Sequence, residues 1–156
     1  MRKRVISEGS RQAAPAEEGW LDLQTLAVVE VTSEDAAHPV ESALVPGAGA
    51  GWRAAQPGGQ VIRLLFDEPQ SLSRVRLLFQ EEEQERTQEF VLRWSPDGGR
   101  SYREVVRQQY TFSPPGTISE AEDYLVELEG VTVLELGITP HIGGGAYASL
   151  KQLRVG

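Results

Sequence analysis

Residues 88–108 read QEFVLRWSPDGGRSYREVVRQ, and this stretch decides the fold class. Large apolar side chains stand at every second position of its first half: Phe90, Leu92 and Trp94. Such alternation is typical of a half-buried β-strand. Ser95–Gly99 then combines a proline, which fixes φ, with glycines that accept positive φ, so it predicts a tight turn. Because apolar residues resume at Val105 and Val106, we predict a β-hairpin at the centre of an antiparallel sheet.

Further strands are predicted on both sides of this hairpin. Four segments show the same period of two: Gln60–Phe66, Leu72–Phe79, Tyr124–Leu128 and Leu134–Ile138. Turn residues at Asp67–Gln70 predict that the first two segments form a second hairpin, and Gly130 predicts another turn. A first strand is expected within residues 20–31 and a closing strand within residues 150–155. Since no amphipathic helix of normal length stands out, the pattern indicates an all-β sandwich or barrel.

Composition limits the class of protein. The 156 residues are enough for one domain, with 40% hydrophobic and 24% charged residues. The net charge of −8 argues against nucleic acid and anionic membrane as partners, because both require a basic surface. No apolar run approaches the roughly 18 residues of a membrane span. The first ten residues begin basic but lack the apolar run of a signal peptide, so we expect a cytoplasmic protein.

Catalysis is poorly supported by the sequence. There is no nucleophile elbow, phosphate-binding loop or His-Glu-x-x-His motif. The absence of cysteine excludes disulfides and thiol chemistry, and the two histidines, His38 and His141, are too far apart to suggest a transition-metal site. We therefore predict a protein that is not an enzyme and has no cofactor. A carboxylate pair for glycoside hydrolysis stays open, because Asp and Glu are plentiful.

Loop lengths point to one end of the domain. Residues Met1–Gly19 are polar and aperiodic, which predicts a flexible tail before a domain at residues 20–156. If successive strands run up and down, the short turns and the chain ends gather at one end. The long connections then gather at the other: Thr32–Gly59, Gln80–Thr87, Gln108–Asp123 and Pro140–Ala146. Binding residues tend to lie on loops held by a rigid scaffold, so we predict the site at the long-loop end.

Several short motifs follow one another in a recognisable order. They are Val31–Glu34, Glu41–Leu44, Gly51–Arg53, Gln60–Phe66, Arg93–Gly99, Val133–Thr139 and Ala148–Val155. In this order, over residues 20–156, they resemble the discoidin, or coagulation factor 5/8 C-type, domains of the galactose-binding-like superfold. The resemblance implies a jelly-roll β-sandwich of about eight antiparallel strands. It also implies binding of sugars, lipids or proteins through loops at one end.

The chain departs from this family where relatives hold a structural calcium ion. Val45–Gly47 stands where many relatives have Asp-Gly, and Gln152 stands where relatives with calcium often have an acidic residue. Calcium requires several oxygen ligands, preferably charged, so we predict no metal site. Glu34, Asp35 and Glu41 remain as alternative ligands.

Five residues at the predicted long-loop end are candidates for ligand binding: Glu34, His38, Arg53, Arg86 and Tyr110. The planar fork of an arginine can hold hydroxyls or carboxylates. An exposed salt bridge with the acidic run Glu81–Glu85 is an equally good interpretation of Arg53 and Arg86. For His38, an exposed or capped ring is the alternative to ligand contact.

Aromatic residues also have two interpretations. Tyr110, Phe112 and Tyr147 fall at the long-loop end, where two exposed rings together would form a binding platform. Packing beneath a loop is the alternative. Trp52 could stack against a sugar ring, although large aromatic side chains are usually well buried, so we predict that Trp52 and Trp94 belong to the core.

Two functions follow from these observations. The first is a non-catalytic module that recognises a carbohydrate or another small polar ligand through the long loops. The second is a protein-interaction module or a subunit of a cytoplasmic assembly. The first rests on analogy of fold, and fold alone does not determine function.

Overall fold

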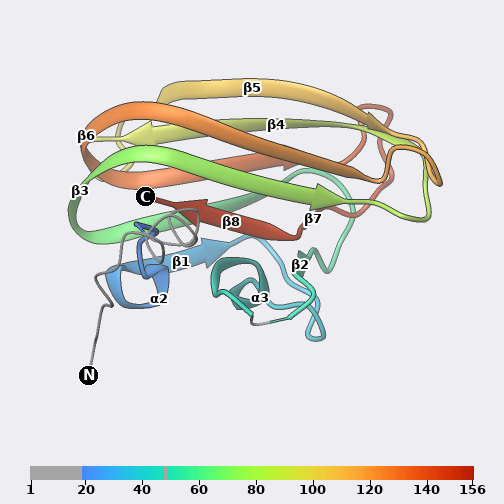
Figure 1. The fold of residues 1–156 in the computed structure, drawn as a ribbon, viewed down its shortest axis with the longest axis horizontal. Coiled ribbons are helices and arrows are strands. Elements are labelled where there is room, and N and C mark those ends of the chain that lie inside the picture. The colour runs from blue at the N-terminus through green and yellow to red at the C-terminus, as the bar shows by residue number, and fades with distance from the viewer. Residues whose placement is uncertain (1–18, 48) are drawn as a thin grey trace, which may run out of the picture.

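The computed structural model describes residues 19–47 and 49–156 (Figure 1). Most of the predicted tail, residues 1–18, lies outside the described residues. The elements in chain order are α2 (Leu23–Leu26), β1 (Ala27–Val31), α3 (Glu41–Leu44), β2 (Trp52–Arg53), β3 (Gln60–Gln80), β4 (Arg86–Ser95), β5 (Arg103–Phe112), β6 (Ser119–Thr139), β7 (Ser149–Leu150) and β8 (Gln152–Val155). Every strand pairing among them is antiparallel. The prediction of an all-β sandwich with about eight antiparallel strands is therefore confirmed.

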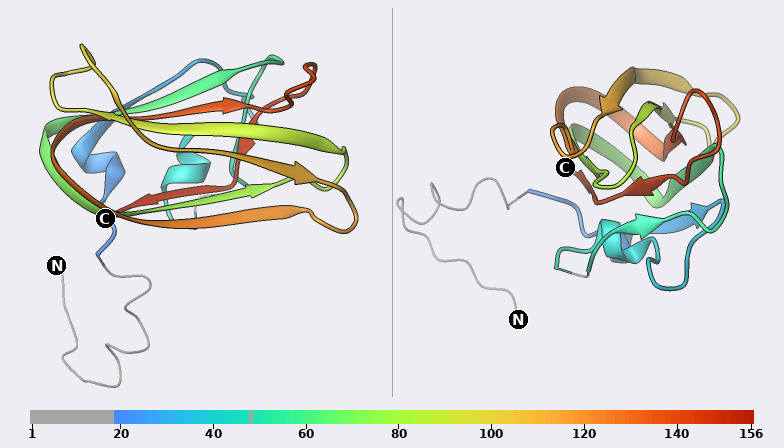
Figure 2. Two further views of the ribbon diagram at one scale, coloured as in Figure 1. Left: turned by 90° about the horizontal axis from the view of Figure 1, so that it is seen from above. Right: turned by 90° about the vertical axis from the view of Figure 1, so that its right-hand side faces the viewer.

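The strands form two layers. One layer contains β1, the first part of β3, the last part of β6, β4 and β5 in that order. The other contains β8, the last part of β3 and the first part of β6. Phe79 in the second layer stacks on Phe90 in the first, with ring centroids 5.2 Å apart, so the layers meet across an apolar core. Figure 2 shows the layers and the short helices α2 and α3 beside them.

The long strands β3 and β6 pass from one layer to the other. Gln60–Leu65 pairs with residues 133–138, and Arg74–Gln80 pairs with residues 119–125, with shifts of register between Leu65 and Arg74. Both strands bend at the same end of the molecule, at the left of Figure 1. The predicted hairpin between Gln60–Phe66 and Leu72–Phe79 is therefore wrong, because the two segments are parts of one strand and do not pair with each other. The turn predicted at Gly130 is likewise a bend within β6. Strands that change sheets commonly do so through bulges and bends.

The β-hairpin predicted within residues 88–108 is present. Residues 86–94 of β4 pair with residues 103–112 of β5, and the turn between them contains Gly98 and Gly99 with φ of 76° and 94°. Its predicted position at the centre of the sheet is wrong, because β5 is the edge strand of the five-stranded layer and β4 lies next to it. Position in a sheet depends on long-range pairing, which local alternation does not specify.

The predicted apolar faces form the core. The buried residues include those at alternating positions of the strands: Ile62, Leu64, Phe66, Val75, Leu77, Phe79, Phe90, Leu92, Trp94, Leu134, Leu136 and Ile138. Trp52 is 1% exposed and its indole Nε1 donates to the Ser33 carbonyl at 2.9 Å, so the interpretation of Trp52 as a core residue is confirmed. Trp94 is buried as predicted.

The outer face of the five-stranded layer carries a row of alternating charges, one from each strand. In register across β1, β3, β6, β4 and β5 the residues are Glu30, Arg63, Glu135, Arg93 and Glu104. Nε of Arg63 donates to Glu135 at 2.8 Å, and Nε of Arg93 lies 3.8 Å from the same carboxylate. Opposite charges on neighbouring strands stabilise a sheet, so this row favours the observed strand register.

The two ends of the sandwich differ as the loop lengths predict. At the bend end, the amide of Gly98 donates to the Thr132 hydroxyl at 2.8 Å, and the Gly156 carbonyl accepts from Ser73 at 2.7 Å. The C-terminus therefore lies at this end, as predicted. In residues 19–47 and 49–156, the structure contains no helix with the length and hydropathy needed to cross a membrane.

Candidate functional site

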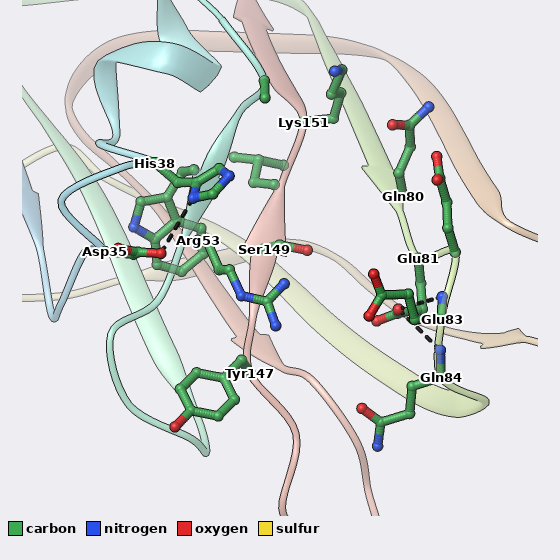
Figure 3. Close-up of a pocket in the computed structure, with 14 residues that line it drawn as sticks. Asp35, His38, Arg53, Gln80, Glu81, Glu83, Gln84, Tyr147, Ser149 and Lys151 are labelled. Atoms are coloured by element: carbon green, nitrogen blue, oxygen red, sulfur yellow. Dashed lines mark hydrogen bonds and ion pairs between the residues drawn. The ribbon is translucent and has the colours of Figure 1, made fainter.

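A hollow of about 510 Å³ lies at the long-loop end of the sandwich (Figure 3). One wall comes from the turn after β1, from β2 and from β7, and the other comes from the end of β3 and the acidic loop that follows it. The connections Thr32–Gly59 and Gln80–Thr87 therefore meet at one hollow, and the prediction that they share one end is confirmed.

Backbone hydrogen bonds hold the other long connections at the same end. The amide of Glu81 donates to the Ile118 carbonyl at 2.8 Å, Ile142 donates to Thr87 at 2.9 Å, and Gly58 donates to Ala146 at 3.0 Å. The connection predicted at Gln108–Asp123 is shorter in the structure, because β5 continues to Phe112 and β6 begins at Ser119. These hydrogen bonds fix the positions of the long connections, so this end of the sandwich has a defined shape.

Asp35 and His38 are placed by a turn that pairs with β2. The amide of Asp35 donates to the Arg53 carbonyl at 2.8 Å, and the amide of Arg53 donates to the His38 carbonyl at 3.1 Å. Within the turn, Nδ1 of His38 lies 3.2 Å from Oδ2 of Asp35. Hydrogen bonds from the Ala37 amide and from His38 lower the pKa of the Asp35 carboxyl, and the nearby charges of His38 and Arg53 add to this effect. Asp35 is therefore a carboxylate acceptor at neutral pH.

Arg53 and Tyr147 form the centre of the wall. The guanidinium carbon of Arg53 lies 5.6 Å from the centroid of the Tyr147 ring, which is a cation–π contact. Arg53 is exposed and makes no ion pair with any residue that the structure describes. Figure 3 shows its side chain pointing into the hollow between Tyr147 and the acidic loop. Its donors are therefore oriented and available to a ligand.

The acidic loop is built around Glu81. One oxygen of its carboxylate accepts from the Arg86 Nε at 2.7 Å, and the other accepts from the amides of Glu83 and Gln84 at 3.1 and 3.2 Å. Burial acts to raise the pKa of Glu81, but the hydrogen bonds from Arg86 and Glu83 outweigh it and lower the pKa. Glu82 and Glu83 are exposed and line the hollow. The loop thus places carboxylates opposite Arg53.

Arg86, a predicted ligand-binding residue, is buried instead. Its side chain is 0% exposed, and Nη1 donates to the Pro140 carbonyl at 2.8 Å and to Gln88 at 3.1 Å. Its guanidinium also lies over the ring of Phe112, 4.8 Å from the centroid. Arg86 therefore cannot contact a ligand in this structure. Its role is to hold the acidic loop and the Pro140 segment together, and the salt bridge to the acidic run is buried rather than exposed.

Tyr110 also lies away from the hollow. It belongs to β5 rather than to a loop, opposite Gln88 in register. Its half-buried ring packs edge-on against Phe112, with centroids 5.0 Å apart. Phe112 is 0% exposed, so these two residues do not form an exposed platform, and the alternative of packing beneath a loop describes them.

A second hollow of about 290 Å³ lies beside the first. It is lined by Glu34 and the alanines Ala36, Ala54 and Ala55, and it shares Asp35, Arg53 and Tyr147 with the first hollow. Of the predicted ligand-binding residues, the structure thus brings Glu34, His38 and Arg53 together and leaves Arg86 and Tyr110 outside. The sequence prediction did not include Asp35, Tyr147 and Lys151 among the ligand-binding residues, although Tyr147 was one of the aromatic candidates.

The nearby carboxylates are engaged in turns rather than arranged around a cation. Oε1 of Glu34 accepts from the Val40 amide at 2.9 Å, and Oδ1 of Asp35 accepts from the Ala37 amide at 3.2 Å. Within the described part of the chain, no group of three or more His, Asp or Glu side chains is arranged to hold a metal ion.

One close pair of carboxylates lies inside the sandwich. Glu120 is 2% exposed, and burial together with the neighbouring Glu122 raises its pKa to about 7. Gln88 donates to Glu120 at 3.5 Å, and Gln108 donates to Glu122 at 2.8 Å. Because Glu120 is closed to solvent, this pair is not available for glycoside hydrolysis.

The groups around the two hollows can donate and accept hydrogen bonds, and Tyr147 adds an exposed ring.

Solved structures with a similar fold include carbohydrate-binding modules, although no protein-family model and no curated protein sequence matches the chain. A pectin-binding module has a TM-score of 0.62 and 15% identity, covering 84% of this chain and 90% of its own. The family 32 module of NanJ from Clostridium perfringens, in complex with galactose, has a TM-score of 0.60 and 14% identity, with coverage of 87% and 96%.

A third similar structure extends over almost the whole chain. CBM32-3, from a family 31 glycoside hydrolase of Clostridium perfringens, has a TM-score of 0.60 and 18% identity and covers 97% of this chain and 98% of its own. At these identities the likeness concerns the fold. The chain therefore shares the β-sandwich fold of these modules, which is the galactose-binding-like fold that the family resemblance implied.

Proposed function

We propose that this protein is a non-catalytic carbohydrate-binding module and that its binding site is the hollow around Arg53 and Tyr147. The observation that carries the proposal is the contact between these two side chains. It places the Arg53 guanidinium, which has no ion pair among the described residues, beside an exposed aromatic ring, next to the Asp35 carboxylate and the His38 ring.

The chemistry of a sugar matches these groups. A sugar hydroxyl donates one hydrogen bond and accepts others, so it pairs with a guanidinium on one side and a carboxylate on the other. An aromatic ring offers a flat apolar surface to the C–H groups of a sugar ring. The similar solved structures support the proposal, because they include modules described as pectin-binding and as bound to galactose.

The test is binding of the full chain to immobilised and free glycans, followed by calorimetry with each glycan that is retained. Arg53→Gln removes the charged donor, and Tyr147→Ala removes the ring. We expect each to weaken binding at least about tenfold, which corresponds to about 1.4 kcal/mol. The matched control is Arg100→Gln, because Arg100 is exposed in the turn between β4 and β5 at the opposite end. Equal affinity of all four proteins would rule out this site, and no retention of any glycan would rule out the function.

A further inference from the structure

The two hollows at the long-loop end are parts of one surface. They measure about 510 and 290 Å³, and Asp35, Arg53 and Tyr147 line both. The cation–π contact between Arg53 and Tyr147 therefore forms a ridge that borders each hollow. Because the same three residues line both hollows, a ligand that contacts them from one hollow can extend into the other.

The second hollow has its own recognition groups. Glu34 is exposed, and the bond from the Val40 amide to its Oε1 fixes the position of its carboxylate. Three alanines also line this hollow and leave room that larger side chains would fill. A fixed polar group among small apolar side chains is the arrangement expected of a pocket that orients a ligand. The second hollow is thus more than an extension of the first.

The charges around both hollows disfavour an acidic ligand. Glu82 and Glu83 are exposed at the first hollow and Glu34 at the second, while Arg53 and Lys151 line the first hollow and form no ion pair with the residues that the structure describes. Like charges brought together across an interface disfavour binding. The carboxylate of a sugar acid would meet this repulsion, whereas neutral hydroxyls can use both the cationic and the anionic groups.

We propose that the site binds a neutral oligosaccharide of at least two sugar residues, one in each hollow, across the Arg53–Tyr147 ridge. This inference rests on the proposed function. The first hollow holds one sugar against Arg53 and the acidic loop. The second holds its neighbour against Glu34. Single sugars occupy one hollow and gain none of the contacts in the other.

Calorimetry on the full chain tests this with matched pairs of probes. The neutral probes are galactose, glucose and mannose with galactobiose, cellobiose and mannobiose, and the acidic probes are galacturonic acid and digalacturonic acid. We expect at least one neutral disaccharide to bind about tenfold more tightly than its own monosaccharide. We also expect digalacturonic acid to bind more weakly than galactobiose.

Two variants locate the second sugar. Ala36 lines the second hollow and not the first, so Ala36→Trp should occupy the second hollow, lower disaccharide affinity more than monosaccharide affinity and thereby remove the advantage of the disaccharide. The control is Ala121→Trp, at an exposed alanine on β6 that lines neither hollow. Unfolding temperatures of both variants establish that they fold.

The proposal is overturned if the neutral disaccharides bind no more tightly than the monosaccharides, if Ala36→Trp has no effect, or if the acidic disaccharide is preferred. In those cases the sugars still bind and the proposed function stands. If none of the eight probes binds, the inference fails, and the broader glycan screen decides separately whether the proposed function fails with it.

Discussion

Replacing Arg86 by methionine removes the guanidinium that joins the acidic loop to the body of the sandwich and keeps most of the aliphatic stem. Three acceptors lose a donor: the Glu81 carboxylate, the Pro140 carbonyl and the Gln88 amide oxygen. Breaking a buried ion pair by removing one partner destabilises a protein by about 3–5 kcal/mol. Because Glu81 is 16% exposed and keeps two amide donors, we expect the lower value, about 3 kcal/mol.

Urea denaturation measures this loss of stability. An unchanged slope of the unfolding free energy against urea concentration would indicate that the folded and unfolded states keep their compactness. For a chain of this size, each kcal/mol lowers the unfolding temperature by about 2–4 °C, so a decrease of about 6–12 °C is expected. The matched control is Glu85→Gln, an exposed position in the same loop, which should change stability by less than about 0.5 kcal/mol.

A double-mutant cycle with Glu81→Gln separates the ion pair from the other contacts of Arg86. We expect a coupling energy above about 1 kcal/mol at pH 7, since the two groups are in direct contact. The hydrogen-bonded Glu81 has a lowered pKa, so its contribution is present above the pKa of the unfolded state and is lost as pH falls through the folded pKa. A loss of sugar affinity with no loss of stability in Arg86→Met would refute this reasoning and restore Arg86 as a ligand anchor.

Substitutions at three further positions have expected outcomes. The raised pKa of Glu120, about 7, means that its contribution to stability is highest at low pH and falls as pH rises from about 4.5 to 7. Glu120→Gln should therefore flatten this decline and be more stable than the parent in urea at pH 8, and a steeper decline would contradict the assignment. Glu135→Ala removes the acceptor of Arg63 and the neighbour of Arg93, and should lower the free energy of unfolding by about 1.5–3 kcal/mol in urea at pH 7. A loss below about 0.5 kcal/mol would show that the charge row contributes little. Gly130 has φ of +70° with open space around it, so Gly130→Ala should cost about 1–2 kcal/mol in thermal unfolding, whereas Gly130→Asn, which tolerates this φ better, should cost less.

The alternation of side chains in the sequence was sufficient to assign the buried faces. Ile62, Leu64, Leu134 and Leu136 all lie in the core, as their spacing predicts. The bends of β3 and β6 were interpreted as turns, because proline and glycine interrupt the alternation in the same way at a bend within one strand and at a turn between two strands. Whether the two halves then pair with each other depends on partners that are distant in sequence.

The error at Arg86 has a related cause. Inward-facing positions of β4 continue the alternation through Arg86, Gln88, Phe90, Leu92 and Trp94, and all five are buried. The two polar members carry no hydrophobic signal, so the strand was predicted to begin later and Arg86 was placed in a loop. Hydrogen bonds to Glu81 and Pro140 allow its burial, and they form only in the folded chain.

The residues that line the candidate site could be predicted only in part. Arg53 and His38 were found because a long irregular loop carries them, and Glu34 lies in the same loop. Tyr147 and Lys151 come from the other end of the chain, and the pairing of β2 with β7 brings them beside Arg53. The cytoplasmic location and the tail at residues 1–19 remain predictions from the sequence.

The continuity of β3 and β6 through both layers determines how the molecule unfolds. Separation of one layer from the other would break the backbone ladder of two strands of 21 residues at their bends, so neither layer is an independent unit. Amide hydrogens in the centres of the two layers should therefore exchange through the same global event and report similar free energies, while the loops at the rim exchange faster.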